Sequence, residues 1–437
     1  MKLTVFEDRH SDRLYPMTLT RPACDLRCGH TKLSEKISRA AGQEIDGYIV
    51  RDYLAESFAG WYDISVNNMD DVDGDLLLVN GRVLAIEVTI PKSGDDEVGW
   101  VTSERDDTAD SVAYIRASAE VVSAAKSKSG SPLEFVENLA SALPRVDVDW
   151  PIIDWPWDLI HQNRDSITDD FVHMGKHGVE GDMHSLSCVY GPEDQAWIAP
   201  TARIHPLVCL DTHGGPIIIE DGVEVHPNTR IEGPCAIGRD TLIVGAKIRE
   251  GCSFGPMCRV GGEVEESIIQ GYSNKYHDGF LGHSYVGEWV NLGANTTNSD
   301  LKNDYGSVDV PVYGEGLEPG TLVHSYDTKV GSFIGDHTKT SIGTLFNTGS
   351  NVGAMCLIMA TGQPLLKFVP TGAWFIGGVV TKGFGYNKLT ETAKAATSRR
   401  GRSLSEADIA VLNHIREITK SEFMAAVKKG RRTPKKS

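Results

Sequence analysis

Residues 223–248, VEVHPNTRIEGPCAIGRDTLIVGAKI, carry an aliphatic side chain at every sixth position: Val225, Ile231, Ile237 and Ile243. A period of six matches neither the 3.6-residue repeat of a helix nor the two-residue alternation of a half-buried strand. It is typical of a hexapeptide β-helix, in which short strands coil into a prism and each face buries one aliphatic residue. This stretch therefore predicts a solenoid of β-strands.

The same interval recurs on both sides of this stretch. Aliphatic or aromatic residues six apart occur at Ile198 and Ile204, at Phe254 and Val260, and at Phe280, Val286 and Leu292. IGDHTK, IGTLFN and VGAMCL continue the pattern after residue 333, with slips of phase. A β-sandwich with chance spacing is the alternative, and the persistence of the repeat over many units disfavours it.

The first part of the chain has a different texture. KLTVFE (residues 2–7) and GDLLLVNGRVLAI (74–86) are expected to contain buried strands, whereas SAEVVSAAKS (118–127) and PLEFVENLASAL (132–143) have helical spacing. We therefore predict an α/β domain over residues 1–190, a hexapeptide-repeat β-helix over 191–385, and a C-terminal helix with a basic tail over 386–437. Ser403, with Glu406 three residues later, is expected to open that helix as a capping box.

Bulk properties exclude some classes of function. The formal net charge is -17, which disfavours nonspecific nucleic-acid binding, although twelve Lys/Arg against four Asp/Glu follow from Lys394 onward. The N-terminus lacks the pattern of a signal peptide, and no window is apolar enough for a membrane helix. The eight cysteines are scattered without zinc or disulfide spacing, which favours a reducing cytoplasm.

Four motifs together resemble the bifunctional N-acetylglucosamine-1-phosphate uridylyltransferase/glucosamine-1-phosphate acetyltransferase family. They are FEDRHSDRLYPMTLTRPACDLRCG (6–29), PWDLIHQN (156–163), SNKYHDGFLGHSYVGEWVNLGANTTNSDLKNDYG (273–306) and GDHTKTSIGTLFNTG (335–349). The resemblance implies a nucleotidyltransferase-like domain followed by a left-handed β-helix that forms homotrimers, with acetyltransferase sites between subunits. It also implies acetyl-CoA as co-substrate, a nucleoside triphosphate and a sugar 1-phosphate as partners, and Mg²⁺ for the N-terminal domain.

The resemblance assigns roles in the β-helix. It makes His277 the catalytic base and Asn291 a contact to the substrate or the acetyl group, while Phe280 stands where the family has a tyrosine that contacts the sugar phosphate. An imidazole titrates near neutral pH and is suited to taking a proton from an attacking amine. Lys275 or Lys302 would meet a sugar phosphate. Asn291 as a corner-capping residue and the two lysines as solvated charges remain alternatives, and His283 is expected to be structural.

The N-terminal domain departs from the resemblance. The loop that normally cradles a triphosphate, FEDRHSDRLYPMT, contains no glycine. Arg13 could still face phosphate, Arg21 lies near a family lysine, and Arg82 stands at the position of the family's metal-binding aspartate. Asp154 or Asp158 would then supply a carboxylate for Mg²⁺, although an aspartate there can equally cap a helix.

Three functions compete on this evidence. The first is a nucleotide-sugar enzyme that joins nucleotidyl transfer to acetyl transfer. The second is an acyltransferase or a scaffold with an inactive N-terminal domain. The third is a zinc enzyme of the γ-carbonic-anhydrase type, which the sequence disfavours because no two histidines of the repeats are 18 residues apart, the spacing expected for one face of consecutive coils.

Overall fold

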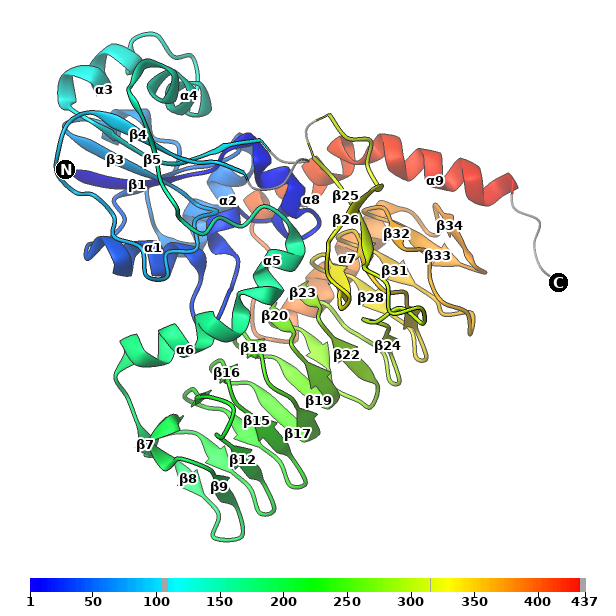
Figure 1. Cartoon of the computed structure of the whole chain (residues 1–437). Coiled ribbons are helices and arrows are strands. Elements are labelled where there is room, and N and C mark those ends of the chain that lie inside the picture. Colours follow the sequence, from blue (N-terminus) through cyan, green and yellow to red (C-terminus); the bar gives the residue numbers. More distant parts are fainter. Residues whose placement is uncertain (104–108, 315, 433–437) are drawn as a thin grey trace.

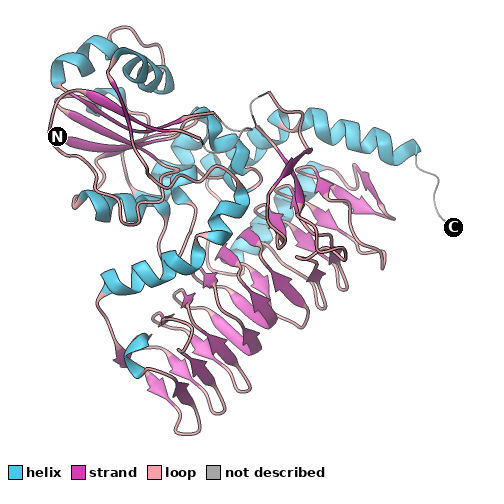
Figure 2. Ribbon diagram, viewed as in Figure 1, coloured by secondary structure: helices cyan, strands magenta, loops and turns pink. Residues whose placement is uncertain are grey.

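The computed structural model describes residues 1–103, 109–314 and 316–432. An α/β domain, a long β-helix and a C-terminal group of helices follow one another along the chain (Figures 1 and 2). The predicted fold class, with its left-handed β-helix, is confirmed. The last residues of the predicted basic tail, 433–437, lie outside the described part.

The α/β domain is built on a six-stranded sheet with the order β2-β1-β3-β5-β4-β6. β1 is parallel to both β2 and β3, whereas β5 is antiparallel to β3 and β4. The strands are β1 (Lys2–Phe6), β2 (Gly47–Ile49), β3 (Leu76–Asn80), β4 (Glu97–Val101), β5 (Ser111–Ala117) and β6 (Arg145–Asp147). The helices are α1 (Leu33–Ala41), α2 (Asp52–Tyr62), α3 (Ala119–Lys126) and α4 (Pro132–Ala142), and 3-10 turns lie at Arg9–Leu14, Met17–Leu19, Ala23–Asp25 and Met69–Asp71. Both predicted strands and both predicted helices of this domain are present.

Two consecutive helices, α5 (Pro156–His161) and α6 (Asn163–Met174), connect the α/β domain to the first coil (Figure 1). One face of the β-helix is a parallel sheet of ten strands. These strands are β7 (Gly178–Val179), β10 (Ala196–Ile198), β13 (Ile217–Ile219), β16 (Cys235–Ile237), β18 (Cys252–Phe254), β20 (Ile268–Gly271), β23 (Tyr285–Glu288), β27 (Ser332–Ile334), β30 (Ser350–Val352) and β32 (Phe368–Val369).

The other faces of the β-helix are shorter and less regular. Their strands are β8 (Asp182–Met183), β9 (Cys188–Tyr190), β11 (Arg203–Ile204), β12 (Cys209–Asp211), β14 (Glu224–Val225), β15 (Arg230–Glu232), β17 (Leu242–Ile248), β19 (Arg259–Glu265), β21 (Asn274–Lys275), β22 (Phe280–Gly282), β24 (Thr297–Asn298), β28 (Lys339–Thr340), β29 (Leu345–Phe346), β31 (Leu357–Ile358), β33 (Trp374–Ile376) and β34 (Val379–Thr381). An antiparallel hairpin, β25 (Asp309–Val312) with β26 (Thr321–His324), interrupts the coils, and a 3-10 turn lies at Glu193–Gln195.

The six-residue repeat forms the core of the prism. Ten of the eleven repeat positions named from the sequence are almost completely buried in one cluster, and Phe280 is the one that is only half-buried. The ten are Ile198, Ile204, Val225, Ile231, Ile237, Ile243, Phe254, Val260, Val286 and Leu292. Each coil stacks on the next by parallel backbone hydrogen bonds, so every coil contributes the same kind of side chain to the same core.

The C-terminal helices return to the α/β domain. α7 (Tyr386–Ser398) is followed by α8 (Glu406–Ile418), which packs against α2, and by α9 (Lys420–Arg432), which packs against β34 at the end of the prism. The predicted capping box is displaced by two residues, because the side chain of Ser405 rather than Ser403 accepts from the backbone of Asp408, and Asp408 reciprocates. Among the described residues, none of the helices is long and apolar enough to cross a bilayer.

The buried repeat position predicts a large stability effect. Ile237 is 0% exposed and Ile342 is 73% exposed. We expect Ile237→Ala to lower the free energy of unfolding by about 2–5 kcal/mol, because it leaves a cavity between stacked coils. Ile342→Ala removes the same atoms from water-exposed surface and is the matched control. Denaturant unfolding of both variants checks this, and equal effects would refute the assignment of Ile237 to the core.

Candidate functional site

The carboxyl edge of the N-terminal sheet is filled by ion pairs within the chain. Arg82 follows β3, is fully buried, and donates from Nη2 to Asp8 at 2.6 Å and from Nη1 to Asp154 at 2.8 Å. Beside it, Arg51 pairs with the buried Glu7 at 3.0 Å. Burial alone would raise the pKa of Asp8, but the adjacent guanidinium of Arg82 holds it below its ordinary value. The arginine that replaces the family's aspartate is thus the centre of a salt-bridge network.

The carboxylates predicted for Mg²⁺ lie at this same edge and are already engaged. Asp154 pairs with Arg82 and lies 3.4 Å from Arg13, whose guanidinium stacks over the ring of Trp155. Asp158 accepts the backbone N–H groups of Asp154 and Trp155 at 2.9 and 2.8 Å and so caps α5. The positive charge beside Asp154 is already provided by Arg82, so an Mg²⁺ ion there would have to displace the guanidinium. In this arrangement the two aspartates do not fit the ion.

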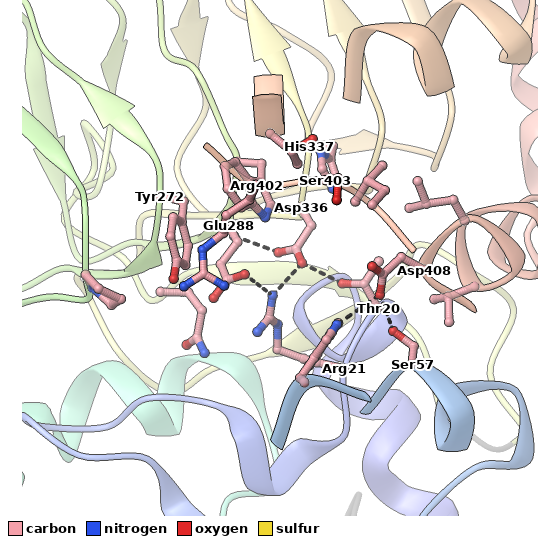
Figure 3. Close-up of a pocket in the computed structure, with 18 of the residues that line it drawn as sticks. Thr20, Arg21, Ser57, Tyr272, Glu288, Asp336, His337, Arg402, Ser403 and Asp408 are labelled. Atoms are coloured by element: carbon pink, nitrogen blue, oxygen red, sulfur yellow. Dashed lines mark hydrogen bonds and ion pairs between the residues drawn. The ribbon is translucent and has the colours of Figure 1, made fainter. Parts of the chain in front are cut away.

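A pocket of about 570 Å³ opens where the α/β domain, the β-helix and the C-terminal helices meet (Figure 3). Its walls come from the loop after β1, from α2, from β-helix corners and from the segment that leads into α8. The lining residues with charged or aromatic side chains are Arg21, Arg27, Lys32, Trp61, Tyr62, Tyr272, Glu288, Trp289, Asp336, His337, Arg402 and Asp408. Of the residues singled out in the sequence, Arg21 alone belongs to this set.

Arg21 forms the buried junction at the floor of this pocket. Its guanidinium lies 2.7 Å from Asp25, 2.7 Å from Asp336 and 3.1 Å from Glu288, so one arginine of the N-terminal loop joins two coils of the β-helix. Thr20 donates a further hydrogen bond to Asp336 at 2.7 Å. Burial would lower the pKa of Arg21, but the three carboxylates raise it well above its ordinary value.

The pocket also presents rings and spare hydrogen-bonding groups. Tyr272 stacks on Trp289 at 4.5 Å, His337 lies parallel to Trp289 at 6.2 Å, and the guanidinium of Arg402 covers Tyr272 at 5.0 Å. Within the described chain, the buried Nε of Arg21, the Nε of Arg27 and the Nδ1 of His337 make no hydrogen bond. Burial lowers the pKa of His337 to about 3, so its ring is neutral at physiological pH. Aromatic rings beside a few polar groups in one cavity are typical of a small-molecule site.

The predicted acetyltransferase residues form a separate group on the β-helix. His277 is exposed in the turn between β21 and β22, and its ring meets Tyr276 edge to face at 5.1 Å. Phe280 lines a small surface hollow of about 240 Å³ with neighbouring coils. Lys275 is buried, and its Nζ donates to the carbonyl oxygens of Gly261 and His277 at 2.9 and 2.7 Å. Lys275 therefore braces the turn that carries His277.

Asn291 lies one coil further along the prism. Its Oδ1 accepts from Nδ2 of Asn274 at 3.0 Å, and Arg400 of the C-terminal segment donates to Asn274 at 2.8 Å. Lys302 lies in another loop, where Nζ donates to the carbonyl of Ser307 at 3.0 Å. The structure thus brings Lys275, His277 and Phe280 into one turn, with Asn291 on the adjacent coil.

His283 is buried, and its Nδ1 lies 2.8 Å from Asp300. Sequence reasoning missed the roles of Asp8, Trp289, His337 and Arg402, because each depends on a partner far away in the chain.

Comparisons with known proteins bear on both domains. Residues 3–177 match the family described as sugar nucleotidyl transferase. Over these residues the N-terminal domain is similar to that family. The chain is 31% identical over 155 residues to a bifunctional sugar-1-phosphate nucleotidylyltransferase/acetyltransferase of Sulfurisphaera tokodaii, a match that covers 33% of this chain and 35% of the relative. It is 38% identical over 153 residues to the bifunctional protein GlmU of Methanococcus aeolicus, covering 33% and 36%.

The aligned segments span about a third of the length of those relatives. Among solved structures, a UDP-N-acetylglucosamine acyltransferase of Francisella novicida is similar at 12% identity over 58% of this chain and 92% of that one, with a TM-score of 0.31. A putative glucose-1-phosphate thymidylyltransferase of Bacillus anthracis is similar at 12% identity over 38% and 95%, with a TM-score of 0.27.

The Arg82 network predicts a pH-dependent stability difference. Arg82→Met leaves two partly buried carboxylates beside a cavity without their guanidinium, and we expect a loss of about 3 kcal/mol of unfolding free energy at neutral pH. Because the folded-state pKa of Asp8 is depressed, the stability it contributes is present above the ordinary carboxyl pKa and is lost as pH falls through the folded value. The difference in unfolding free energy between wild type and variant should therefore narrow as the pH falls below about 4, from the ordinary carboxyl pKa toward the lower folded value.

Urea unfolding at a series of pH values measures this gap. Arg145→Met is the matched control, since Arg145 also pairs with two aspartates but is 44% exposed, and we expect it to change nothing measurable. A gap that widens on acidification would contradict the depressed pKa of Asp8.

Proposed function

We propose that the chain is a two-domain transferase of nucleotide-sugar metabolism. Its N-terminal domain would transfer a nucleotidyl group from a nucleoside triphosphate to a sugar 1-phosphate, and its β-helix would transfer acetyl from acetyl-CoA to an amino-sugar phosphate. The observation that carries the proposal is the match of residues 3–177 to the sugar nucleotidyl transferase family, in one chain with a hexapeptide β-helix. The relatives whose names combine both activities support it. The proposal includes a cytoplasmic homotrimer, as in the family that the sequence resembles.

The acetyl-transfer step is assigned to the turn that carries His277. The amine of the acceptor attacks the carbonyl carbon of the thioester, His277 takes the proton from that nitrogen, and the carbon–sulfur bond breaks to release coenzyme A as the thiol. Asn291 is proposed to contact the acetyl group during this step. The exposure of His277 supports the assignment, because a large acyl donor and an acceptor can reach the ring from solvent.

The interdomain pocket is our proposed site for the sugar 1-phosphate. Arg27, Lys32 and Arg402 line the cavity and provide positive charge for the phosphate of such a ligand. Glu288 and Asp408 supply acceptors for hydroxyl groups.

An acyltransferase with an inactive N-terminal domain is the second candidate. The Arg82 network favours it, since the guanidinium lies between the carboxylates that the family resemblance would give to Mg²⁺. The two candidates differ in one product. Pyrophosphate release from a nucleoside triphosphate, sugar 1-phosphate and Mg²⁺ is expected from the first and absent from the second, whereas both release coenzyme A.

The role of His277 predicts a specific loss of rate. With acetyl-CoA and a panel of amino-sugar 1-phosphates, we expect His277→Ala to lower kcat at least about 100-fold, the usual worth of a general base. His324→Ala is the matched control, since His324 is also an exposed histidine and pairs with Asp309 in the hairpin. Thiol release detected by a chromogenic disulfide measures both. Equal rates for wild type and His277→Ala would remove His277 from the reaction.

The pocket assignment predicts a binding defect. Arg402→Ala should raise the Kd for a sugar 1-phosphate about tenfold or more, because a charge-assisted hydrogen bond contributes roughly 1.5–3 kcal/mol. Trp61 and Trp289 line the pocket, so quenching of tryptophan fluorescence provides the readout. Arg399→Ala, an exposed arginine at the end of α7, is the control. Unchanged affinity in Arg402→Ala would exclude this pocket as the phosphate site.

A further inference from the structure

Three histidines occupy the same place in three successive coils of the β-helix. His184, His205 and His226 each follow a strand of one column, and the pairing of Met183 with Ile204 and of Ile204 with Val225 puts them in register. The backbone N–H of His205 donates to the carbonyl of Val225 at 2.9 Å, as expected for adjacent coils. The histidines are 21 residues apart rather than 18, because the coils here include longer corners. The 18-residue spacing expected from the sequence for histidines on one face was therefore wrong for this column.

Two of these histidines converge on one carboxylate. The Nε2 atoms of His205 and His226 lie 3.8 and 3.6 Å from the same oxygen, Oε2 of Glu224, and the two imidazole rings are 4.9 Å apart at an interplanar angle of 59°. His205, Glu224 and His226 each offer one ligand atom, and these three atoms lie within 4.8 Å of one another. The three side chains are half-buried, so they are fixed in place yet accessible to an ion.

A simple histidine–glutamate ion pair does not account for this arrangement. A separation of 3.8 Å is too long for a hydrogen bond, and the Nε2 atom of His205 is buried without a hydrogen-bond partner in the described chain. Two rings aimed at one oxygen would also compete for it. A cation between the three atoms satisfies all of them at once.

We propose that His205, Glu224 and His226 bind a zinc ion. Two imidazole nitrogens and one carboxylate oxygen are ligands that zinc prefers, and bonds of about 2.0–2.2 Å place tetrahedral ligand atoms roughly 3.3–3.5 Å apart. The two histidine–glutamate separations, 3.8 and 3.6 Å, need to shorten by only a few tenths of an ångström. Three protein ligands leave one position for water or for a donor from another molecule.

The zinc would fasten two coils of the prism to each other. His205 comes from the coil of β11, and Glu224 and His226 come from the coil of β14. The metal would therefore add a link between two coils that are otherwise held together by backbone hydrogen bonds and core packing. None of the three ligands lines the interdomain pocket or lies in the turn of His277. The proposal thus stands independently of the proposed transferase activities.

Titration of the metal-free full-length chain, without an affinity tag, tests the proposal. Zinc is followed by calorimetry, and Co²⁺ in its place by visible absorption, which reports a tetrahedral site with nitrogen and oxygen ligands. We expect one equivalent of either metal per chain. His205→Ala and His226→Ala each remove one ligand. Changes to residues that only orient a ligand typically weaken metal binding by about 10–100-fold, and we expect these two variants to weaken it by more than that.

Two further variants keep the test decisive. Glu224→Gln retains the shape of the side chain and should also lose the site, even if an alanine variant folds poorly. His213→Ala is the matched control, because His213 is an exposed histidine 2.9 Å from Asp211 elsewhere on the coils, and it should bind zinc as wild type does. Absence of stoichiometric binding in wild type, or equal binding in wild type and in the ligand variants, would overturn the proposal.

Discussion

The burial of Arg21 among three carboxylates is the interaction on which the arrangement of the whole chain depends. Its partners come from its own loop and from two coils more than 260 residues later, Asp25 on one side and Glu288 and Asp336 on the other. A buried charge is tolerated only when its hydrogen bonds are nearly all made, and loss of one partner leaves the others uncompensated. This network therefore fixes the angle at which the α/β domain meets the prism, and it fixes the floor of the pocket between them.

The same logic governs the carboxyl edge of the N-terminal sheet. Doubly charged metal and singly charged guanidinium both neutralise carboxylates, but the guanidinium does so with directional hydrogen bonds and is covalently part of the fold. With Arg82 between Asp8 and Asp154, the edge is a stable structural element of this domain. Substrate binding at that edge would have to displace these ion pairs, whereas the interdomain pocket is an open cavity of about 570 Å³.

Local patterns in the sequence predicted the fold well, but contacts between residues far apart in the chain could not be predicted from it. The six-residue period identified the prism because each coil repeats the same burial pattern. The burial of Ile231 and Ile237 could therefore be predicted without knowing which residues pack against them. The helix after residue 403 was also recognisable, although its cap moved to Ser405, since two serines flank the start and only the geometry of Asp408 selects one. The pocket could not be predicted from the sequence, because its residues Trp61, Trp289 and Arg402 come from three distant segments of the chain.

The spacing of histidines illustrates why a rule derived from an ideal repeat misleads in a real one. Eighteen residues per coil assumes three equal corners, yet the column of His205 and His226 advances by 21 because the corner loops are longer there. Backbone hydrogen bonds between coils restore the register after each insertion, so the side chains still stack. In such a fold, the pairing of strands between coils therefore determines which side chains lie next to each other, and the number of residues between them does not. Irregular corners can bring together metal ligands that a strict period would separate.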